Sequence, residues 1–375
     1  MSQAIRTTPS AFTHAGTPRG IDALARFRRA ILFGAGASVG EVRKVLDRYG
    51  IAIAAFADNS PAKQGTSFEG APILAPATLP GLIDDTTCIV IASVYQTEIA
   101  EQLAGFGIPA DVIFPFVSPM FAGHFGGGAF TDAEALARLP ARLADDESRA
   151  YLAALIDFRW TMEPARLRRN PRLKGFYQYD GPFVGPLAGD HIVDVGAYNG
   201  DSATAYLERL NGNARVSGLE PLPQNLKALA GTIAAHRFGR AITPVPFGAG
   251  AAPASAEIDS EDEAPDARAT LRRKPGATTT IRIETLDRLF AADRVDFIKI
   301  DIEGHDPAAL MGARELLARD KPGLAVAAYH APEHLWEIPA LLDRLCPGYR
   351  IHLGHHPAAA YECELFCVHE SRVGA

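Results

Sequence analysis

Four ionisable side chains stand at the end of the stretch FIKIDIEGHD, residues 297–306. They are Asp301, Glu303, His305 and Asp306. The apolar, β-branched start of the stretch is typical of a buried strand, and ligands of open α/β sheets lie outside the carboxyl ends of the strands. Carboxylate and imidazole groups there could bind a polar ligand or accept a proton. The stretch therefore predicts a chemical site at the carboxyl end of its strand.

The predicted catalytic set contains five residues. Asp301 and His305 are equal candidates for the base, and His330 is third because it ends the next apolar run, GLAVAAYH. Lys299 either polarises an acceptor oxygen or forms a structural ion pair. Glu303 either orients a neighbour or caps the following helix.

A second cluster lies in VDVGAYNGD, residues 193–201. Its pattern predicts a strand, a tight turn and a helix start, with Gly196 allowing close backbone approach and Gly200 close packing. Asp194 ends the strand, where an acid suits a cationic amino group. Glu220 ends the next strand, where an acid can accept both hydroxyls of a ribose. S-adenosylmethionine (SAM) carries both groups, so we predict a SAM site to which Asn199, Asp201 and Gly248 also belong.

A metal site is a weaker interpretation of the same stretch. Asp301, Glu303, His305 and Asp306 offer oxygen and imidazole ligands. Their spacing inside one strand-to-helix turn matches no strict ligand pattern, so the prediction names no metal ligand and disfavours a divalent ion.

Strand-like runs place these residues in the second of two α/β units. Seven runs alternate with helical segments and predict a mostly parallel sheet. The short segment between the last two runs predicts a hairpin and an antiparallel edge strand. The runs cover residues 191–196, 215–221, 242–250, 295–306, 323–330, 349–354 and 363–369.

A smaller unit precedes it, over about residues 28–118. AILFGAG, IAIAAFADN, CIVIASV and ADVIFPF predict parallel strands with crossover helices. Gly34, Gly36 and Gly40 follow the first strand as GxGxxxG, a weak dinucleotide signal, and Asp58 ends the second. Tyr95 has Ile99 four residues on, so no YxxxK pair supports hydride transfer.

The remaining segments are expected to join or flank the units. Residues 1–27 are interpreted as a flexible tail and residues 119–175 as a linker and helical connector. Within residues 119–175, the glycine-rich segment 123–130 is expected to be a flexible joint, and Pro140 is expected to break the helix.

Composition excludes some classes of protein. The net charge of −7 argues against a nucleic-acid partner, which needs a basic face. No run is long enough to span a membrane, and no secretory h-region precedes the first unit. Four cysteines without a CxxC pair suggest buried thiols. We expect a cytoplasmic protein of undetermined oligomeric state that acts on a small molecule or glycan.

Residues 176–369 resemble the FkbM-type SAM-dependent methyltransferases. The resemblance rests on HIVDVGAYNGD, VSGLEPLPQNLKAL, PVPFGAG, TIRIETLDRL, VDFIKIDIEGHDPAALMGARELL and GLAVAAYH. It implies a class I methyltransferase fold over residues 176–375, with methyl transfer from SAM usually to oxygen, on hydroxyls of sugars, glycan precursors or natural products. It also implies a segment that closes over SAM, with Tyr177, Gln178 and Tyr179 as contacts.

The stretch ADNSPAKQGTSFEGAPIL in the first unit resembles the Rossmann-like domains found ahead of sugar-modifying acyltransferases and some FkbM methyltransferases. That resemblance implies nucleotide or nucleotide-sugar binding, with Gly34, Gly36 and Asp58 as weak candidates. The alternative to a methyltransferase is therefore a nucleotide-sugar-binding or NAD-dependent sugar-modifying protein centred on this unit.

Overall fold

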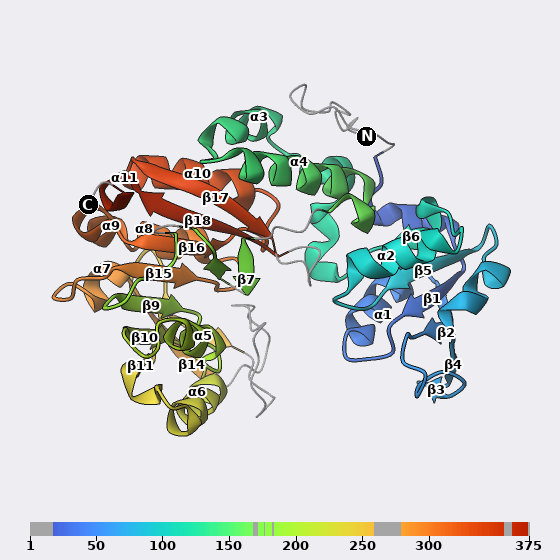
Figure 1. The fold of residues 1–375 in the computed structure, drawn as a ribbon, viewed down its shortest axis with the longest axis horizontal. Coiled ribbons are helices and arrows are strands. Elements are labelled where there is room, and N and C mark those ends of the chain that lie inside the picture. Colours follow the sequence, from blue (N-terminus) through green and yellow to red (C-terminus); the bar gives the residue numbers. More distant parts are fainter. Residues whose placement is uncertain are drawn as a thin grey trace.

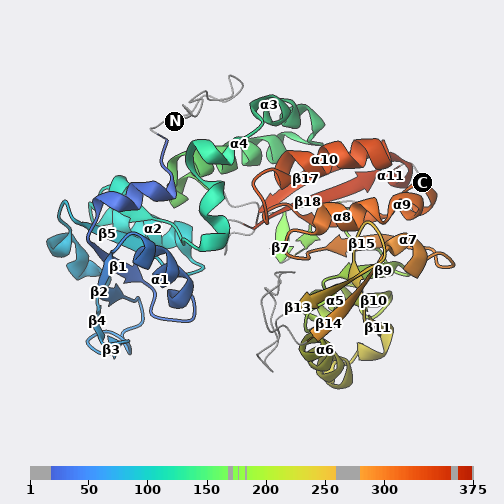
Figure 2. The ribbon, with the colours of Figure 1, turned by 180° about the vertical axis from the view of Figure 1, so that it is seen from behind.

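The computed structural model describes residues 18–167, 172–175, 177–181, 184–258, 279–355 and 362–373. Two α/β units lie at opposite ends of the molecule, and helices α3 and α4 run along one side between them (Figure 1). The same arrangement is seen from behind in Figure 2. No helix of the described residues combines the length and apolarity that a membrane crossing requires.

The first unit is a six-stranded sheet in the order β3-β4-β2-β1-β5-β6. Its strands pair in parallel except for β3, which is antiparallel to β4. The four predicted strands are present, whereas the short β3 and β4 were not predicted. The elements are β1 Arg29–Phe33, α1 Val39–Arg48, β2 Ala52–Ala57, β3 Ser67–Phe68, β4 Ala71–Leu74, η2 Pro76–Leu82, β5 Thr87–Ile91, α2 Gln96–Gly105, η3 Ala110–Val112 and β6 Ile113–Phe114.

The end of the predicted tail is folded rather than loose. A 3-10 helix, η1, covers Ile21–Arg26, and Leu24 and Phe27 are buried in the core of the first unit. The Phe27 ring lies edge-on to Phe114, with centroids 5.7 Å apart. The prediction of a flexible tail is therefore wrong for this segment, because two large apolar side chains anchor it. Residues 1–17 lie outside the described residues.

The connector begins with two 3-10 turns, η4 Pro119–His124 and η5 Gly126–Ala129. Two helices follow, α3 Ala133–Arg142 and α4 Asp146–Thr161, each with an aspartate N-cap. Pro140 lies inside α3, so the predicted break is wrong by two residues; the helix ends only after Arg142. A proline in the last turn removes one hydrogen bond and leaves the preceding turns intact.

The connector packs on the second unit. His124, in the segment expected to be a flexible joint, is buried and shares a 2.7 Å hydrogen bond between Nε2 and the Tyr329 carbonyl oxygen. From α4, the Ser148 hydroxyl oxygen accepts the backbone N–H of Leu353 at 3.1 Å. The first contact holds the glycine-rich turns against the second unit, and the second holds α4 against it.

The second unit is a seven-stranded sheet in the order β11-β10-β9-β15-β16-β18-β17. All of its described pairs are parallel except those of β18, which runs antiparallel to both β16 and β17. The predicted hairpin between the last two strands is confirmed. The antiparallel strand, however, lies inside the sheet, and β17 forms the edge. The strands are β9 His191–Val195, β10 Arg215–Leu219, β11 Ile242–Val245, β15 Phe297–Ile300, β16 Gly323–Ala327, β17 Tyr349–His355 and β18 Cys363–His369.

Helices cover both faces of this sheet, and two small sheets flank it. The flanking sheets are β7-β8 and β12-β14-β13, neither of which was predicted. The acidic run 257–268 lies almost wholly outside the described residues. The further elements are η6 Pro164–Arg166, β7 Leu173–Gly175, β8 Gln178–Tyr179, α5 Asp201–Arg209, α6 Pro223–Ala235, η7 Gly239–Ala241, β12 Gly248–Ala249, β13 Ala254–Ile258, β14 Thr279–Glu284, α7 Leu286–Leu289, α8 Asp306–Met311, α9 Arg314–Asp320, α10 His334–Leu345 and α11 Glu370–Val373. All four cysteines are buried free thiols.

Candidate active site

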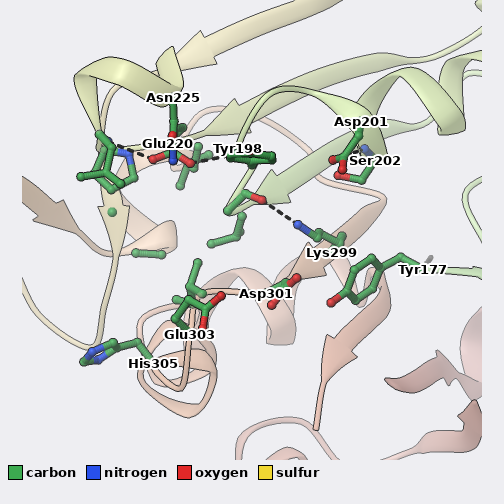
Figure 3. Close-up of a pocket in the computed structure, with 18 of the residues that line it drawn as sticks. Tyr177, Tyr198, Asp201, Ser202, Glu220, Asn225, Lys299, Asp301, Glu303 and His305 are labelled. Carbon is green, nitrogen blue, oxygen red and sulfur yellow. Dashed lines mark hydrogen bonds between the residues drawn. The ribbon is translucent and has the colours of Figure 1, made fainter. Parts of the chain in front are cut away.

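A cavity of about 600 Å³ lies at the carboxyl ends of β9, β10 and β15. In Figure 3, Tyr177, Lys299 and Asp301 lie on one side of it and Glu220 and Tyr198 on another. Of the predicted residues, eight line it: Gly196, Asp201, Glu220, Gly248, Lys299, Asp301, Glu303 and His305. The lid candidates Tyr177 and Gln178 line it as well.

Two glycines of VDVGAYNGD are required by the backbone and the packing. Gly196 has φ +82°, and a Cβ there would lie 2.0 Å from the Asp301 carbonyl oxygen. Gly200 has φ +88°, and its Cβ would lie 2.7 Å from Leu229. Side chains at these positions would separate β9 from β15 and lift α5 from α6. Gly200 and the neighbouring Asn199 do not line the cavity; the Asn199 side-chain oxygen accepts the Asp201 backbone N–H at 3.2 Å.

Glu220 is fixed at the end of β10. Its two oxygens accept the backbone N–H groups of Tyr198, at 3.0 Å, and Leu222, at 2.9 Å. Burial raises the pKa of Glu220, against the lowering effect of these hydrogen bonds and of Asn225. Each carboxylate oxygen can accept a second hydrogen bond, so this group can receive ligand hydroxyls without losing its anchors.

Asp194 lies behind the cavity rather than in its wall, contrary to its predicted direct contact with the cofactor. Its side chain is fully buried, with Oδ1 3.1 Å from the Lys299 Nζ and Oδ2 accepting the Ser202 hydroxyl at 2.6 Å. Lys299 also donates to the Gly196 carbonyl oxygen at 2.7 Å. Burial alone would lower the pKa of Lys299, but Asp194 and Asp301 outweigh it and raise the pKa. Lys299 is therefore a charged group of the cavity wall, and Asp194 is its support.

His330 is also behind the wall, where it joins two acids. Its Nδ1 lies 2.8 Å from Asp306 Oδ2 and its Nε2 3.2 Å from Asp301 Oδ1. Burial alone would lower the pKa of His330, but Asp306 and Asp301 raise it well above the usual value. Conversely, burial would raise the pKa of Asp301, but His330 and Lys299 hold it well below the usual range. An imidazolium cannot accept a proton, and so acidic a carboxyl is a poor base.

His305 lies at the mouth of the cavity, on the turn between β15 and α8. It is exposed, and Figure 3 shows its ring on the far side of Glu303 from Lys299. Glu303 has φ +54° and Gly304 φ +97°. This left-handed turn carries Glu303 and His305 outward from the strand end, so both side chains reach the cavity wall.

The aromatic lid candidates have separate positions. Tyr177 is buried in the cavity wall with φ +55°, and its ring centroid lies 5.1 Å from the Lys299 Nζ. Tyr179 points elsewhere: its ring packs on Phe366, with centroids 5.0 Å apart. The predicted lid contact is wrong for Tyr179, because adjacent β8 residues face opposite sides.

The four residues weighed as a metal set do not converge on one point. Asp306 faces away from the cavity, where Oδ1 accepts the Ile302 backbone N–H at 3.1 Å and Oδ2 lies beside His330. Among the described residues, Asp306, His330 and His334 are the one group whose potential ligand atoms lie within 4.8 Å of one another. This group lies behind the cavity wall.

The remaining wall residues were not predicted. They supply one apolar end of the cavity, formed by β10, β12 and β14, and further polar groups; they are Val195, Tyr198, Ser202, Ala205, Leu219, Pro221, Leu222, Asn225, Phe247, Ala249, Ile281, Ile283, Ile302, Tyr329 and Glu362. Tyr198 and Tyr329 stood inside quoted motifs. Ile281 and Ile283 stood inside the quoted stretch TIRIETLDRL but were not singled out as site residues, and nothing in the sequence signalled Glu362. All three reach the cavity through tertiary packing.

The candidate residues of the first unit also border a cavity. Gly34, Gly36 and Asp58 line a separate hollow of about 510 Å³ at the carboxyl edge of the first sheet.

Comparisons with known proteins agree with this architecture. Residues 194–351 match the family model of the methyltransferase FkbM domain, and residues 26–114 match that of the C2185-like N-terminal domain. The chain is similar to the crystal structure of methyltransferase FkbM from Methylobacillus flagellatus KT, with 24% identity, 92% of each chain covered and a TM-score of 0.69. No curated protein matches it.

Two weaker likenesses are to fibrillarin and to a sugar-nucleotide enzyme. Aeropyrum pernix fibrillarin, solved with natively bound SAM, is 18% identical over 60% of this chain and 76% of that chain, with a TM-score of 0.32. UDP-D-quinovosamine 4-dehydrogenase from Vibrio fischeri is 20% identical over 27% of this chain and 89% of that chain, with a TM-score of 0.21.

The sheet order, the glycine turn and the acid at the end of β10 belong to the class I methyltransferase fold. Residues 194–351 match the FkbM methyltransferase domain, and this match supports a SAM-dependent methyltransferase.

Proposed function

We propose that the protein transfers a methyl group from SAM to a hydroxyl of a sugar, a glycan precursor or a natural product. The observation that carries the proposal is the cavity at the strand ends, which offers hydroxyl-binding carboxylates at two places. One is Glu220, and the other is the group Asp301, Glu303 and Glu362.

The wall residues fit SAM. Glu220, with its two backbone anchors, suits ribose hydroxyls, and the apolar residues Leu222, Ile281 and Ile283 beside it suit an adenine ring. Asp201 and Asp301 add negative charge toward the other side, which suits a ligand with a sulfonium and an ammonium group. SAM supplies an electrophilic methyl group.

The acceptor side favours a polyhydroxyl compound over an anion. Asp301, Glu303 and Glu362 line the cavity there, and carboxylates bind hydroxyls as paired hydrogen-bond acceptors. They would repel a phosphate or carboxylate placed in their midst. Lys299 is partly neutralised by Asp194, so it does not reverse this preference.

His305 is the proposed base. Asp301 and His330 are committed to each other and hold the wrong protonation states for this role. Among the described histidines, His305 alone lines the cavity, and histidine is the side chain that most often acts as a general base. In this proposal Asp301 orients the acceptor hydroxyl and His305 takes its proton.

Calorimetric titration with SAM tests the cofactor half of the proposal. Glu220→Ala should weaken SAM binding by about 10–100-fold, because hydrogen bonds to a charged group are worth about 1.5–3 kcal/mol. Glu101→Ala, at an exposed position of α2, is the matched control and should bind SAM as the wild type does. Equal SAM affinity in both variants would contradict the assignment of Glu220.

The acceptor half is tested by a screen of sugars, glycan precursors and polyhydroxyl natural products, with S-adenosylhomocysteine as the measured product. For an accepted substrate, His305→Ala should lower kcat by about 10²–10⁴-fold while the Kd for SAM stays unchanged. A kcat within a few-fold of the wild type would remove His305 as the base.

A further inference from the structure

One loop of the second unit sets the direction of the Asp301 carboxylate. The loop joins β16 to α10 and covers residues 328–333. Within it, Tyr329 lines the methyltransferase cavity and donates its hydroxyl to Asp301 Oδ1 at 3.2 Å. His330, the next residue, places its Nε2 3.2 Å from the same oxygen. The orientation of Asp301 in the cavity wall therefore depends on where this loop lies.

The connector holds the backbone of this loop through His124, which does not itself line the cavity. Its Nε2 lies 2.7 Å from the Tyr329 carbonyl oxygen. Because a carbonyl oxygen only accepts hydrogen bonds, Nε2 must carry the proton. Burial and the nearby Arg159 lower the pKa of His124 to about 3, so the ring is neutral at the pH of most cells and donates through Nε2.

The position of His124 is itself fixed. The residue is only 1% exposed, and its ring lies edge-on to Phe121, with centroids 5.5 Å apart. Immediately before η4, the Ser118 hydroxyl donates to Glu41 Oε2 of α1 at 3.2 Å. The turn η4 is thus held at its start by the first unit and at its end by the loop. A donor fixed in this way can position the loop.

Two other contacts of the connector with the second unit have different targets. The Arg159 guanidinium donates to the Pro332 carbonyl oxygen at 3.3 Å, further along the same loop. The Ser148 hydroxyl oxygen accepts the backbone N–H of Leu353 on β17. Of these three contacts, that of His124 is the one made to a residue whose side chain binds Asp301.

We propose that His124 is a positioning residue for methyl transfer. Its Nε2–H fixes the Tyr329 backbone, the Tyr329 hydroxyl then directs the Asp301 carboxylate, and Asp301 orients the acceptor hydroxyl. Only the last of these steps rests on the proposed function, since it assigns Asp301 to the acceptor. The connector therefore contributes to the acceptor side of the cavity, although none of its described residues lines that cavity.

Tyrosine labelled with carbon-13 at Cζ gives a test that needs no acceptor, because the Cζ chemical shift responds to hydrogen bonding of the hydroxyl. Tyr329→Phe identifies the Tyr329 signal, and Asp301→Ala gives its position without the carboxylate partner. His124→Phe should move the signal toward that position. His124→Gln, whose amide can donate from the place of the ring Nε2, should leave it near the wild-type position. Ser148→Ala is the matched control, because it removes the connector hydrogen bond to β17 and should not move the signal.

Kinetics with an accepted substrate provide the second readout. His124→Phe should lower kcat about tenfold, because a misdirected carboxylate misplaces the acceptor hydroxyl, while the Kd for SAM stays unchanged. His124→Gln restores the donor and should recover kcat to within about threefold of the wild type. In a Tyr329→Phe background, which lacks the hydroxyl, His124→Phe should change kcat by less than about twofold more. His124→Asn, whose amide stops short of the carbonyl, replaces His124→Phe if that variant does not fold.

Three results would each overturn the proposal: an unmoved Tyr329 signal in His124→Phe, an equal movement in Ser148→Ala, or additive effects of the His124 and Tyr329 changes on kcat. A wild-type protein that methylates no hydroxyl compound would instead refute the proposed function. The spectra would still decide whether His124 acts on Tyr329, so the two failures are distinguishable.

Discussion

Individual residues of the methyltransferase cavity act in pairs, with one member in the wall and one behind it. Lys299 faces the ligand space and rests on Asp194, and Asp301 faces it and rests on His330. Burying a charge is tolerated only when it is paired and hydrogen-bonded. The acids and bases in the motifs therefore include residues that face the ligand and residues that hold these in place. Removing a residue of the second kind would impair ligand binding much as removing one of the first kind does.

Breaking the Lys299–Asp194 pair should be more harmful than removing it. Lys299→Met should lower the free energy of unfolding by about 3–5 kcal/mol, since it leaves Asp194 buried without its cation. The double variant Asp194→Asn/Lys299→Met should recover part of that loss in urea unfolding. The exposed Lys227→Met on α6 is the control. A double variant less stable than Lys299→Met would contradict the pairing. For the same reason, weaker SAM binding by Asp194→Ala alone would not identify Asp194 as a contact.

The ion pairs of His330 with Asp301 and Asp306, here called the His330 clamp, predict a pH dependence of the free energy of unfolding. The raised pKa of His330 means that its stabilisation is complete below about pH 6.5, the unfolded value, and is lost as pH rises through the folded value. The lowered pKa of Asp301 means that its stabilisation is present above about pH 4 and is lost in acid. The unfolding free energy of the wild type should therefore exceed that of His330→Gln by more at pH 6 than at pH 9.

The control for this measurement is His305→Gln, which alters a histidine outside the clamp. Its difference from the wild type should show no comparable fall between the two pH values. A constant difference for His330→Gln would mean that His330 is neutral in the folded protein.

Among the elements, the inserted strand β18 and the short β7–β8 pair determine how the cavity is closed. Glu364 of β18 is fully buried, and its Oε1 accepts the Tyr177 backbone N–H at 3.1 Å. Tyr206 of α5 donates its hydroxyl to the Tyr177 carbonyl oxygen at 2.9 Å. A tyrosine with φ +55° persists only when its surroundings hold it, and these two bonds hold Tyr177 against the cavity.

Variants of Glu364 test this positioning role. Burial raises the pKa of Glu364 well above its usual value, which favours the protonated acid. Glu364→Gln should therefore preserve both the hydrogen bond and the activity. Glu364→Leu should leave the Tyr177 N–H unpaired, at a cost of about 1–3 kcal/mol, and raise the KM for SAM more than it lowers kcat. If Glu364→Gln and Glu364→Leu gave the same KM for SAM, Glu364 would have no positioning role.

At the scale of the whole molecule, the connector packs on both units: η4 and η6 lie against α1 and α2 of the first, and α3 and α4 against the methyltransferase unit. It contacts that unit through His124, Ser148 and Arg159, whose guanidinium donates to the Pro332 carbonyl oxygen at 3.3 Å. Its helices lie along β17 and α10 (Figure 1). The connector thus extends the core of the second unit at the edge of the sheet, where β17 would otherwise expose one side.

A shortened chain of residues 119–375 should accordingly keep the methyltransferase site. We expect its Kd for SAM to lie within about threefold of that of the full chain, because every cavity residue and the connector remain. A chain that starts at residue 172 lacks α3 and α4 and should aggregate or lose cooperative unfolding. Circular dichroism measures the cooperativity of unfolding, and calorimetry measures the Kd for SAM. Loss of SAM binding by residues 119–375 would show that the site depends on the first unit.

The sequence by itself determined the two α/β units, the order of the strands along the chain, and the groups at the strand ends. These follow from local rules: buried parallel strands are continuous apolar runs, and glycines such as Gly196 stand where the backbone turns. The hairpin of β17 and β18 was equally local.

Only the tertiary structure decided which side chains of one motif face the ligand. Asp194 and Asp301 both lie at strand ends. Asp194 pairs with Lys299 and lies behind the cavity wall, whereas Asp301 pairs with His330 and lies in the wall. The insertion of β18 beside β16, and the approach of Ile281 and Glu362 to the cavity, join residues far apart in the chain. Spacing along the chain carries no information about such partners, because contacts across a sheet depend on strand order and register.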